Sequence, residues 1–379
     1  MAWFIGLMSG TSLDGVDGVL AQAEGGAALQ ARGHVHLPFT PALRAELLTL
    51  NRSGIDELHR SALAANALVS LYATLVAQLL LTAGLVPTDV TAIGAHGQTV
   101  RHRPGEFDGH GYTVQLINGA LLAEQSGIDV VCDFRSRDVA AGGQGAPLVP
   151  AFHAACFAQP GQDIAVLNLG GIANLTLLRA NGEVLGFDTG PGNLLMDLWC
   201  QRHQGKAFDE GGRWAASGRV DAALLQSMLA EPYFERLPPK STGRDLFDAN
   251  WLDRHHAVMR QDMPTHMPEN TMATLAELTA LSVVQALQWH ARRTTELLVC
   301  GGGAFNTLLM LRLTSQLAAP SGAKVRVRST AAMGVPPDQV EALAFAWLAS
   351  AFVARRAGNL PAVTGAAGPR VLGALYPAG

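Results

Sequence analysis

Apolar and polar residues follow one another in short blocks that predict an α/β fold. Apolar runs predict strands at residues 4–9, 16–22, 90–96, 113–117 and 127–134. A helix is predicted from Glu341 to about Arg356, because arginines occupy its last turn and Gly358 follows. Strands, glycine-rich turns and helices interleave along the whole chain, which is typical of α/β proteins.

The longest apolar stretch, residues 61–88, contains no charged residue and has the length of a membrane span. Polar residues nevertheless recur at every fourth position within it, at Asn66, Ser70, Thr74, Gln78 and Thr82. Such a polar stripe predicts a long, largely buried helix of a soluble domain over residues 61–83 rather than a span.

The pattern of residues at the start of the chain occurs again in its middle. Residues 4–20, FIGLMSGTSLDGVDGVL, read as a strand, a turn of small polar residues and a second strand. Residues 163–180, DIAVLNLGGIANLTLLRA, repeat this order. The pair suggests a duplicated architecture, although two copies alone are also compatible with chance.

Composition excludes several classes of protein. The 379 residues are 49% hydrophobic and 15% charged with a net charge of -4, which indicates a globular protein and argues against a sequence-independent nucleic-acid binder. The four cysteines show no CxxC spacing, so neither a zinc ribbon nor a disulfide framework is indicated. The first residues, MAWFIG, lack the features of a signal peptide, and we expect a cytoplasmic protein.

Three glycine-rich turns are candidates for binding a nucleotide. In MSGTSLDG, backbone N–H groups and hydroxyls could converge on a phosphate, but a plain hairpin turn is equally compatible. NLGGIAN repeats the arrangement around Gly170, Gly171 and Asn174. CGGGAFN follows an apolar run, so its glycines either admit a ring or ribose or serve helix packing. Neither a Walker P-loop nor a GxGxxG fingerprint is present at these turns.

Seven motifs in order give the chain a resemblance to the anhydro-N-acetylmuramic acid kinase family. They are GLMSGTSLDGVD, AHGQTVRH, GQGAPLVP, LNLGGIAN, FDTGPGN, CGGGAFN and EALAFAW. The resemblance covers about residues 5–348. It implies two RNase H-like lobes of the sugar kinase, Hsp70 and actin superfamily, with ATP in the cleft between them. We expect the first lobe to comprise residues 1–133 with 362–379, and the second to comprise residues 134–361.

The resemblance also implies a reaction. ATP and water convert 1,6-anhydro-N-acetylmuramic acid to N-acetylmuramic acid 6-phosphate and ADP, in peptidoglycan recycling. Asp188 in FDTGPGN is implied as the base that activates water, and Glu341 as a second acidic residue at the sugar. Taken alone, Asp188 is more typical of a turn or helix cap than of a base, and Glu341 is more typical of an acid in the first turn of a helix.

ATP and Mg²⁺ are the implied cofactors, with a homodimer as the implied assembly and no nucleic-acid or membrane partner. Asp14 and Asp17 are candidates to hold the metal, and the sequence does not decide between them. For the sugar and its lactyl carboxylate we expect His96, Gln98 and Arg135. Asn118 stands where the family more often shows an aspartate, which leaves its contact to the sugar open. The residues expected at the nucleotide are Gly10, Thr11, Ser12, Leu13, Asp14, Gly15, Val16, Asp17, Gly170, Gly171, Asn174, Gly301, Gly302, Gly303 and Asn306.

Overall fold

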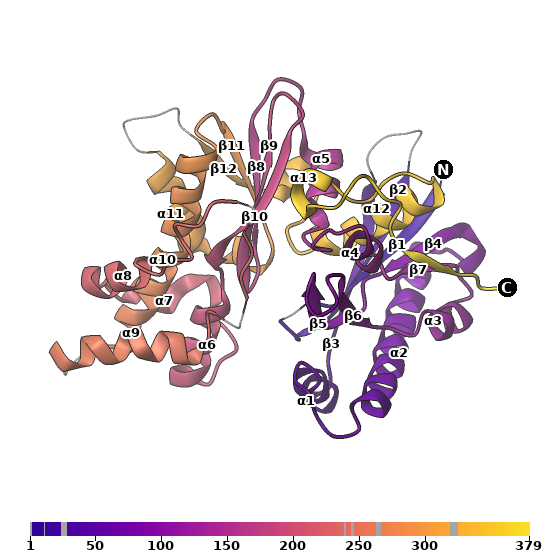
Figure 1. The fold of residues 1–379 in the computed structure, drawn as a ribbon, viewed down its shortest axis with the longest axis horizontal. Helices are drawn as coiled ribbons and strands as arrows, with labels where there is room; N and C mark the ends of the chain where they lie inside the picture. The colour runs from indigo at the N-terminus through magenta and orange to yellow at the C-terminus, as the bar shows by residue number, and fades with distance from the viewer. Residues whose placement is uncertain are drawn as a thin grey trace. The chain divides into compact units, whose positions relative to one another are not determined.

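The computed structural model describes residues 2–10, 12–23, 29–238, 240–243, 246–262, 267–318 and 325–379. The chain forms two compact units (Figure 1). Unit 1 comprises Met1–Cys156 and Gln339–Gly379, and unit 2 comprises Phe157–Asp338. Thr11 lies outside the described residues, so its expected role at the nucleotide stays a prediction.

Unit 1 is built on a mixed sheet with the order β13-β7-β4-β1-β2-β3. Antiparallel pairs join β1 to β2 and β2 to β3, whereas β1, β4 and β7 are parallel. Its strands are β1 (Ala2–Met8), β2 (Gly15–Ala23), β3 (Gln30–Pro38), β4 (Val90–Ala95), β7 (Val130–Cys132) and β13 (Ala374–Tyr376). The predicted strand at residues 113–117 is β6 (Gly111–Leu116), which pairs with β5 (Gln98–Pro104) in a separate hairpin and not with this sheet.

Two long helices cover opposite faces of this sheet. Leu7 pairs with Gly18, and its neighbour Gly6 pairs with Val19. Because neighbouring residues of a strand point to opposite faces of a sheet, Gly18 and Gly6 border opposite faces. A Cβ on Gly18 would lie 2.0 Å from Leu75 of α2 (Glu57–Ala83), and a Cβ on Gly6 would lie 1.8 Å from the Ala342 carbonyl oxygen of α12 (Val340–Val353). Glycine therefore lets each helix approach the strands closely.

The α2 helix is long and apolar enough to cross a membrane by length and composition, but half of its most apolar window is buried. Its buried residues include Leu68, Tyr72, Leu75 and Leu79, while the predicted polar stripe faces outward. This packing confirms the buried core helix that the polar stripe predicts.

The observed units differ from the expected lobes at both boundaries. Residues 134–156 and 339–361 belong to unit 1, not to the second lobe. The physical reason is packing, since α12 rests on β1 and β4, where Gly6 and Gly94 are directly paired. Sequence order alone could not show that a helix beginning at Val340 completes a sheet that starts at Ala2.

Shorter helices complete the described part of unit 1. They are α1 (Pro41–Thr49), α3 (Gly119–Ser126), α4 (Ser136–Ala140), α5 (Val149–Phe157) and α13 (Pro361–Thr364), with a 3-10 turn at Pro87–Asp89. Strand β13 pairs antiparallel with β7, so the C-terminal segment returns to unit 1, as Figure 1 shows in yellow beside purple.

Unit 2 repeats the strand order of unit 1. Its sheet runs β10-β9-β8-β11-β12, with antiparallel pairs at β8–β9 and β9–β10 and parallel pairs at β8–β11 and β11–β12. The strands are β8 (Ile164–Leu169), β9 (Ile172–Leu178), β10 (Val184–Pro191), β11 (Glu296–Cys300) and β12 (Arg326–Ser329). In unit 1 the strands β3-β2-β1-β4-β7 pair in the same sequence of antiparallel and parallel directions as β10-β9-β8-β11-β12 of unit 2. This match confirms the duplicated RNase H-like architecture.

Helices cover the unit 2 sheet around a core that includes Trp199, Trp251 and Leu278. Among them, α10 contacts α6, α7, α8 and α11. Their bounds are α6 (Leu194–Gln204), α7 (Arg213–Ser217), α8 (Ala222–Leu229), α9 (Ala249–Asp262), α10 (Pro268–His290) and α11 (Thr307–Leu317), with 3-10 turns at Glu210–Gly212, Gly302–Phe305 and Thr330–Met333.

Candidate active site

The first glycine-rich turn connects β1 to β2 in unit 1. The Leu13 amide donates to the Gly10 carbonyl at 3.3 Å, and Asp14 accepts from the Ser12 hydroxyl at 2.7 Å and the Gly15 amide at 3.0 Å. Leu13 has a φ of 56°, a left-handed conformation that costs a non-glycine residue free energy and often marks functional loops. The motif is therefore a hairpin turn with a tightly held backbone, which is compatible with both interpretations of the sequence.

The side chains of Leu13 and Val16 are buried in the core of unit 1. Only their backbone groups are therefore suited to contact a ligand. Asp17 lies at the start of β2, where one carboxylate oxygen is 3.0 Å from His34 Nε2 and 3.1 Å from His36 Nδ1. Within the described residues, no three His, Cys, Asp or Glu side chains assemble into a metal site.

Three of the expected sugar residues lie together in unit 1. His96 and Gln98 follow β4 and are almost fully buried, and the Ser9 hydroxyl donates to Gln98 Oε1. His96 Nε2 accepts from Arg135 Nε at 3.2 Å and lies 3.0 Å from Nη2, while its Nδ1 lies 3.3 Å from the Ser9 carbonyl oxygen. Since Nε2 accepts, the proton belongs on Nδ1.

Burial and the neighbouring Arg135 lower the pKa of His96 to about 3. The imidazole therefore stays neutral at physiological pH and serves as an acceptor for the guanidinium. Burial also lowers the pKa of Arg135 to about 10, although Glu341 and Asp138 oppose that shift. Arg135 remains a cation.

Glu341 lies in the first turn of α12, near enough to Arg135 to stabilise its charge. The packing of Ala342 on Gly6 sets this position. Glu341 thus joins His96, Gln98 and Arg135 in unit 1, so the structure brings four predicted residues together. Glu341 therefore lies in the first turn of a helix and also close to the charge of Arg135, and its role at the sugar stays a prediction.

Two other polar residues of unit 1 have structural roles. Arg101 donates to Glu57 Oε1 at 2.6 Å and to the Leu50 carbonyl, away from His96. Asn118 caps α3 by accepting from the Leu121 amide at 3.0 Å, and its amide donates to Asn66 of α2 at 2.9 Å. A cap explains Asn118 without a contact to sugar.

Asp188 lies in unit 2, on β10 beside a bulge that ends at Gly190. One carboxylate oxygen accepts from the Thr242 amide at 3.0 Å. Burial raises the pKa of Asp188 to about 6, while the Thr242 hydrogen bond and the charge of Lys240 oppose the shift. A carboxylate with a pKa just below physiological pH is ionised yet basic enough to accept a proton.

Sequence reasoning missed the residues that hold Asp188. The Tyr233 hydroxyl donates to the Asp188 carbonyl at 2.9 Å, and the Asp188 amide donates to the Lys240 carbonyl at 3.1 Å. Lys240 Nζ lies 4.9 Å from the Tyr233 ring centroid and donates to the Phe234 carbonyl at 3.1 Å. The polar run KST at residues 240–242 was the available signal, because lysine is scarce in this chain.

The second glycine-rich turn connects β8 to β9 and is tied to the loop after β10. The Asn193 amide donates to the Gly170 carbonyl at 2.8 Å, and the Gly192 amide to the Gly171 carbonyl at 2.9 Å. Asn174 is directly opposite Asp188 across β9 and β10. This turn and the catalytic candidate are thus parts of one local structure.

In the third turn, which follows β11, close packing requires two of the three glycines. Gly301 has a φ of 78°, and a Cβ there would lie 2.3 Å from Asn168 Oδ1. A Cβ on Gly303 would lie 2.5 Å from the Leu169 Cβ. At Gly302 the nearest atom would be 3.9 Å away, so Gly302 is the open position of the three. Asn306 caps α11 by accepting from the Leu309 amide at 3.2 Å.

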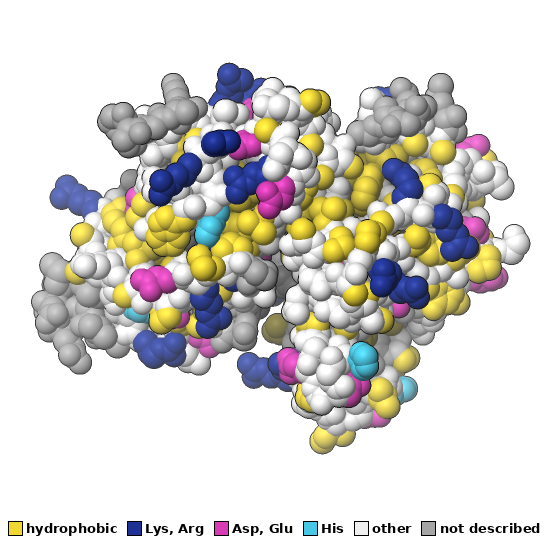
Figure 2. All heavy atoms as spheres, turned by 45° about the horizontal axis from the view of Figure 1, so that its top comes forward, with side chains coloured by type: hydrophobic (Ala, Val, Ile, Leu, Met, Phe, Trp, Pro, Cys, Tyr) yellow, Lys and Arg dark blue, Asp and Glu magenta, His cyan; other side chains and the backbone are white. Residues whose placement is uncertain are grey.

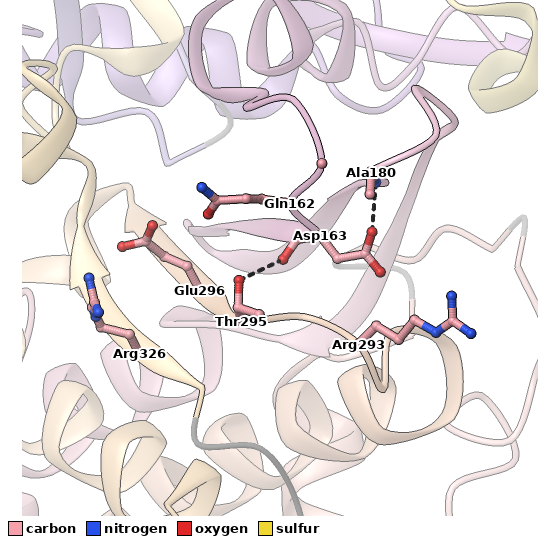
Figure 3. Close-up of a pocket in the computed structure, with 8 residues that line it drawn as sticks. Gln162, Asp163, Ala180, Arg293, Thr295, Glu296 and Arg326 are labelled. Atoms are coloured by element: carbon pink, nitrogen blue, oxygen red, sulfur yellow. Dashed lines mark hydrogen bonds between the residues drawn. The ribbon is translucent and has the colours of Figure 1, made fainter.

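A cavity of about 490 Å³ lies in unit 2 at the opposite end of the same sheet (Figure 3). Its lining includes Asp163, Thr295 and Arg326, which lie next to the beginnings of β8, β11 and β12. The glycine-rich turns lie at the ends of β8 and β11, where ligands of open α/β sheets bind.

The face in Figure 2 shows Lys and Arg interspersed with acidic and uncharged side chains.

Two α/β units with one strand order, each with a glycine-rich turn in its first hairpin, define the fold of the sugar kinase, Hsp70 and actin superfamily. A family model described as anhydro-N-acetylmuramic acid kinase matches residues 2–378. The chain belongs to the anhydro-N-acetylmuramic acid kinase family.

Relatives of that name are similar over nearly the whole length. The protein from Bordetella petrii is 60% identical over 376 residues, which cover 99% of this chain and 96% of the relative. The protein from Ralstonia nicotianae is 55% identical over 380 residues, with coverages of 99% and 97%. A solved glucokinase of the ROK family from Streptomyces griseus, in complex with glucose and AMPPNP, aligns with 92% of this chain and 99% of its own at 12% identity and a TM-score of 0.41.

Proposed function

We propose that this protein is a kinase that uses ATP and water to open 1,6-anhydro-N-acetylmuramic acid and phosphorylate it. Water attacks the anomeric carbon, the bond from that carbon to the bridging oxygen breaks, and this oxygen takes the γ-phosphoryl group. The products are N-acetylmuramic acid 6-phosphate and ADP. What carries the proposal is a 60% identity to a relative of that name over 99% of the chain.

Asp188 is the proposed general base. Its pKa is raised to about 6. Within the described residues its carboxylate accepts one hydrogen bond, from the Thr242 amide, so it can still accept a proton from water. The hydrogen bonds from Tyr233 and to Lys240 hold the backbone of Asp188. We infer that this support fixes the direction in which the carboxylate points.

Arg135 is proposed to bind the lactyl carboxylate of the sugar. Its guanidinium has five N–H donors. Within the described part of the chain, three of them have partners: Nε and Nη2 each direct one donor to His96 Nε2, and Nη1 donates to the Gly145 carbonyl at 2.9 Å. The other donors suit a carboxylate. Glu341 and Gln98 are proposed to hold sugar hydroxyls.

ATP and Mg²⁺ are the proposed cofactors, and the residues fit them. The turns at Gly10, Gly170 and Gly302 offer backbone approach for phosphates and ribose. In both Asp14 and Asp17 one carboxylate oxygen has two partners, but Asp14 is exposed whereas Asp17 is only partly exposed, so Asp14 fits a hydrated Mg²⁺ better. Asp14 would hold the hydrated Mg²⁺, which would supply charge neutralisation for the transferring phosphoryl group.

ADP release in the presence and absence of the anhydro sugar tests the function. We expect release to require the sugar, and ³¹P NMR to show a sugar 6-phosphate. With ¹⁸O-labelled water, the label should appear at the anomeric oxygen and not in the phosphate. Release without sugar would contradict the proposal and favour an ATPase or phosphohydrolase acting on another substrate.

At saturating ATP, kcat/KM for the anhydro sugar should rise with pH through an apparent pKa of about 6 and then level off, because kcat/KM reports the ionisable groups of the enzyme before the sugar binds. Asp188 must be ionised to accept a proton, so a tenfold loss is expected about one pH unit below that value. His96, with a pKa of about 3, does not titrate in this range. A kcat/KM for the sugar that stays level from pH 8 down to pH 5 would rule out this assignment.

The finer expectations stay predictions. These are a cytoplasmic location, a role in peptidoglycan recycling, a homodimer and the absence of nucleic-acid and membrane partners.

A further inference from the structure

Asp138 is a buried acid in unit 1 that the proposed chemistry does not use. Its side chain has no exposed surface. One oxygen accepts from Asn359 Nδ2 at 2.7 Å and from the Thr364 hydroxyl at 2.8 Å, and the other accepts from the Gly145 amide at 2.7 Å. A buried carboxylate is tolerated when donors surround it in this way.

These hydrogen bonds join two distant segments. Residues 138–145 meet residues 359–367 through the Asp138 side chain and through backbone bonds. The Gln144 amide donates to the Thr364 carbonyl at 2.7 Å, and the Ala367 amide to the Ala141 carbonyl at 2.8 Å. A Cβ on Gly143 would lie 2.3 Å from Asp138 Oδ2, so glycine lets the loop wrap around the carboxylate.

Gly145 connects this cluster to the proposed sugar site. Its amide donates to Asp138, and its carbonyl accepts from Arg135 Nη1 at 2.9 Å. The other edge of the same guanidinium donates to His96 Nε2. Asp138 therefore fixes one of the two supports that orient Arg135.

We propose that Asp138 is a positioning residue for sugar binding, which acts through Gly145 to hold the Arg135 guanidinium in the orientation that receives the substrate carboxylate. The proposal rests on the proposed function of the Arg135 site. A carboxylate is required because both oxygens only accept, whereas an asparagine presents an N–H₂ group to at least one of the three donors. The segment at residues 359–364 thereby takes part in substrate recognition without touching the substrate.

Asp138→Asn should raise KM for the anhydro sugar about tenfold or more, with KM for ATP changed less than about twofold. Adding Asn359→Asp should restore much of the affinity, because the exchanged pair again matches donor to acceptor. Glu296→Gln is the matched control, a buried carboxylate at the start of β11 that accepts from Arg328 at 2.5 Å. It should affect thermal stability without changing either KM.

If Asp138→Asn does not fold, Thr364→Val removes one donor while keeping the side-chain shape, and it should raise the sugar KM in the same direction. An unchanged sugar KM in the folded variant, with a loss of thermal stability like that of Glu296→Gln, would overturn the proposal. So would a failure of the exchanged pair to recover affinity beyond the single variant.

A measurement without substrate separates this proposal from the proposed function. In protein with ¹⁵N-labelled histidine, a His96→Gln spectrum assigns the His96 ring, and we expect a protonated Nδ1 and an Nε2 that accepts. Asp138→Asn should shift the Nε2 resonance or mix the tautomers, and Glu296→Gln should not. If Asp138→Asn leaves the Nε2 signal unmoved, Asp138 does not position Arg135. If that signal moves but the wild-type protein has no activity on the sugar, only the proposed function is contradicted.

Discussion

Asp188→Asn is expected to lower kcat by about 10⁴-fold, at or beyond the upper end of what general-base assistance commonly supplies. Asparagine keeps the size of the side chain and its acceptor for the Thr242 amide at 3.0 Å, but it cannot take a proton from water. Because ring opening and phosphoryl transfer are coupled, neither can proceed without that attack. Substrate affinity should change little, so kcat and kcat/KM should fall together in steady-state kinetics.

Stability measurements distinguish a chemical loss from an unfolded variant. The pKa of Asp188 is raised in the folded state, so the stabilising contribution of the protonated form is complete below the unfolded pKa of about 3.8 and is lost as pH rises through about 6. At pH 7 the ionised group disfavours folding relative to a neutral one. Asp188→Asn should therefore unfold at the wild-type temperature or above it.

Asp163→Asn is the matched control for this variant. Asp163 lies in the same unit beside the cavity at the opposite end of the sheet, where it accepts from the Ala180 amide at 2.6 Å (Figure 3). It should retain wild-type kcat. If Asp188→Asn keeps near-normal turnover at saturating substrates, Asp188 is not the base, and Glu341 becomes the next candidate.

Much of the fold could be predicted because local patterns carry it. The strands β1, β2, β4 and β7 and the helix α2 lie where apolar runs and a polar stripe predict them. The similarity of the opening and middle segments also predicts the repeated strand order. The boundaries of the units could not be predicted, since they depend on the fit of α12 to Gly6 and Gly94, more than 240 residues apart from it in sequence.

The candidate site was predictable only in part, for the same reason. Motif order identified Asp188, but its supports Tyr233 and Thr242 come from a segment 45 and 54 residues further along the chain. Arg135 could be predicted as a partner for the substrate carboxylate. Its dependence on Gly145 and Asp138 requires the folded loop, because nothing in local sequence marks a carbonyl as the acceptor for a distant guanidinium.

Gly6→Ala is expected to destabilise unit 1 by about 3 kcal/mol or more, at or beyond the upper end of typical overpacking costs. The new Cβ would lie 1.8 Å from the Ala342 carbonyl oxygen and 2.6 Å from the Ala346 amide nitrogen. Both contacts are to helix backbone, which cannot rotate away as a side chain can. Denaturant titration should therefore show a lower midpoint, and the displaced helix should carry Glu341 away from Arg135 with a loss of sugar turnover.

Gly33→Ala is the matched control, because it adds the same methyl group to β3 of the same sheet. There the nearest atom, Leu79 Cδ2, would be 3.6 Å away, an ordinary van der Waals contact. Stability and turnover should stay close to wild type, since the methyl group would meet only side-chain atoms, and at van der Waals distance. If Gly6→Ala and Gly33→Ala unfold at the same denaturant concentration, α12 does not rest on β1 at Gly6. The assignment of residues 339–361 to unit 1, and with it the position of Glu341, would then have to be abandoned.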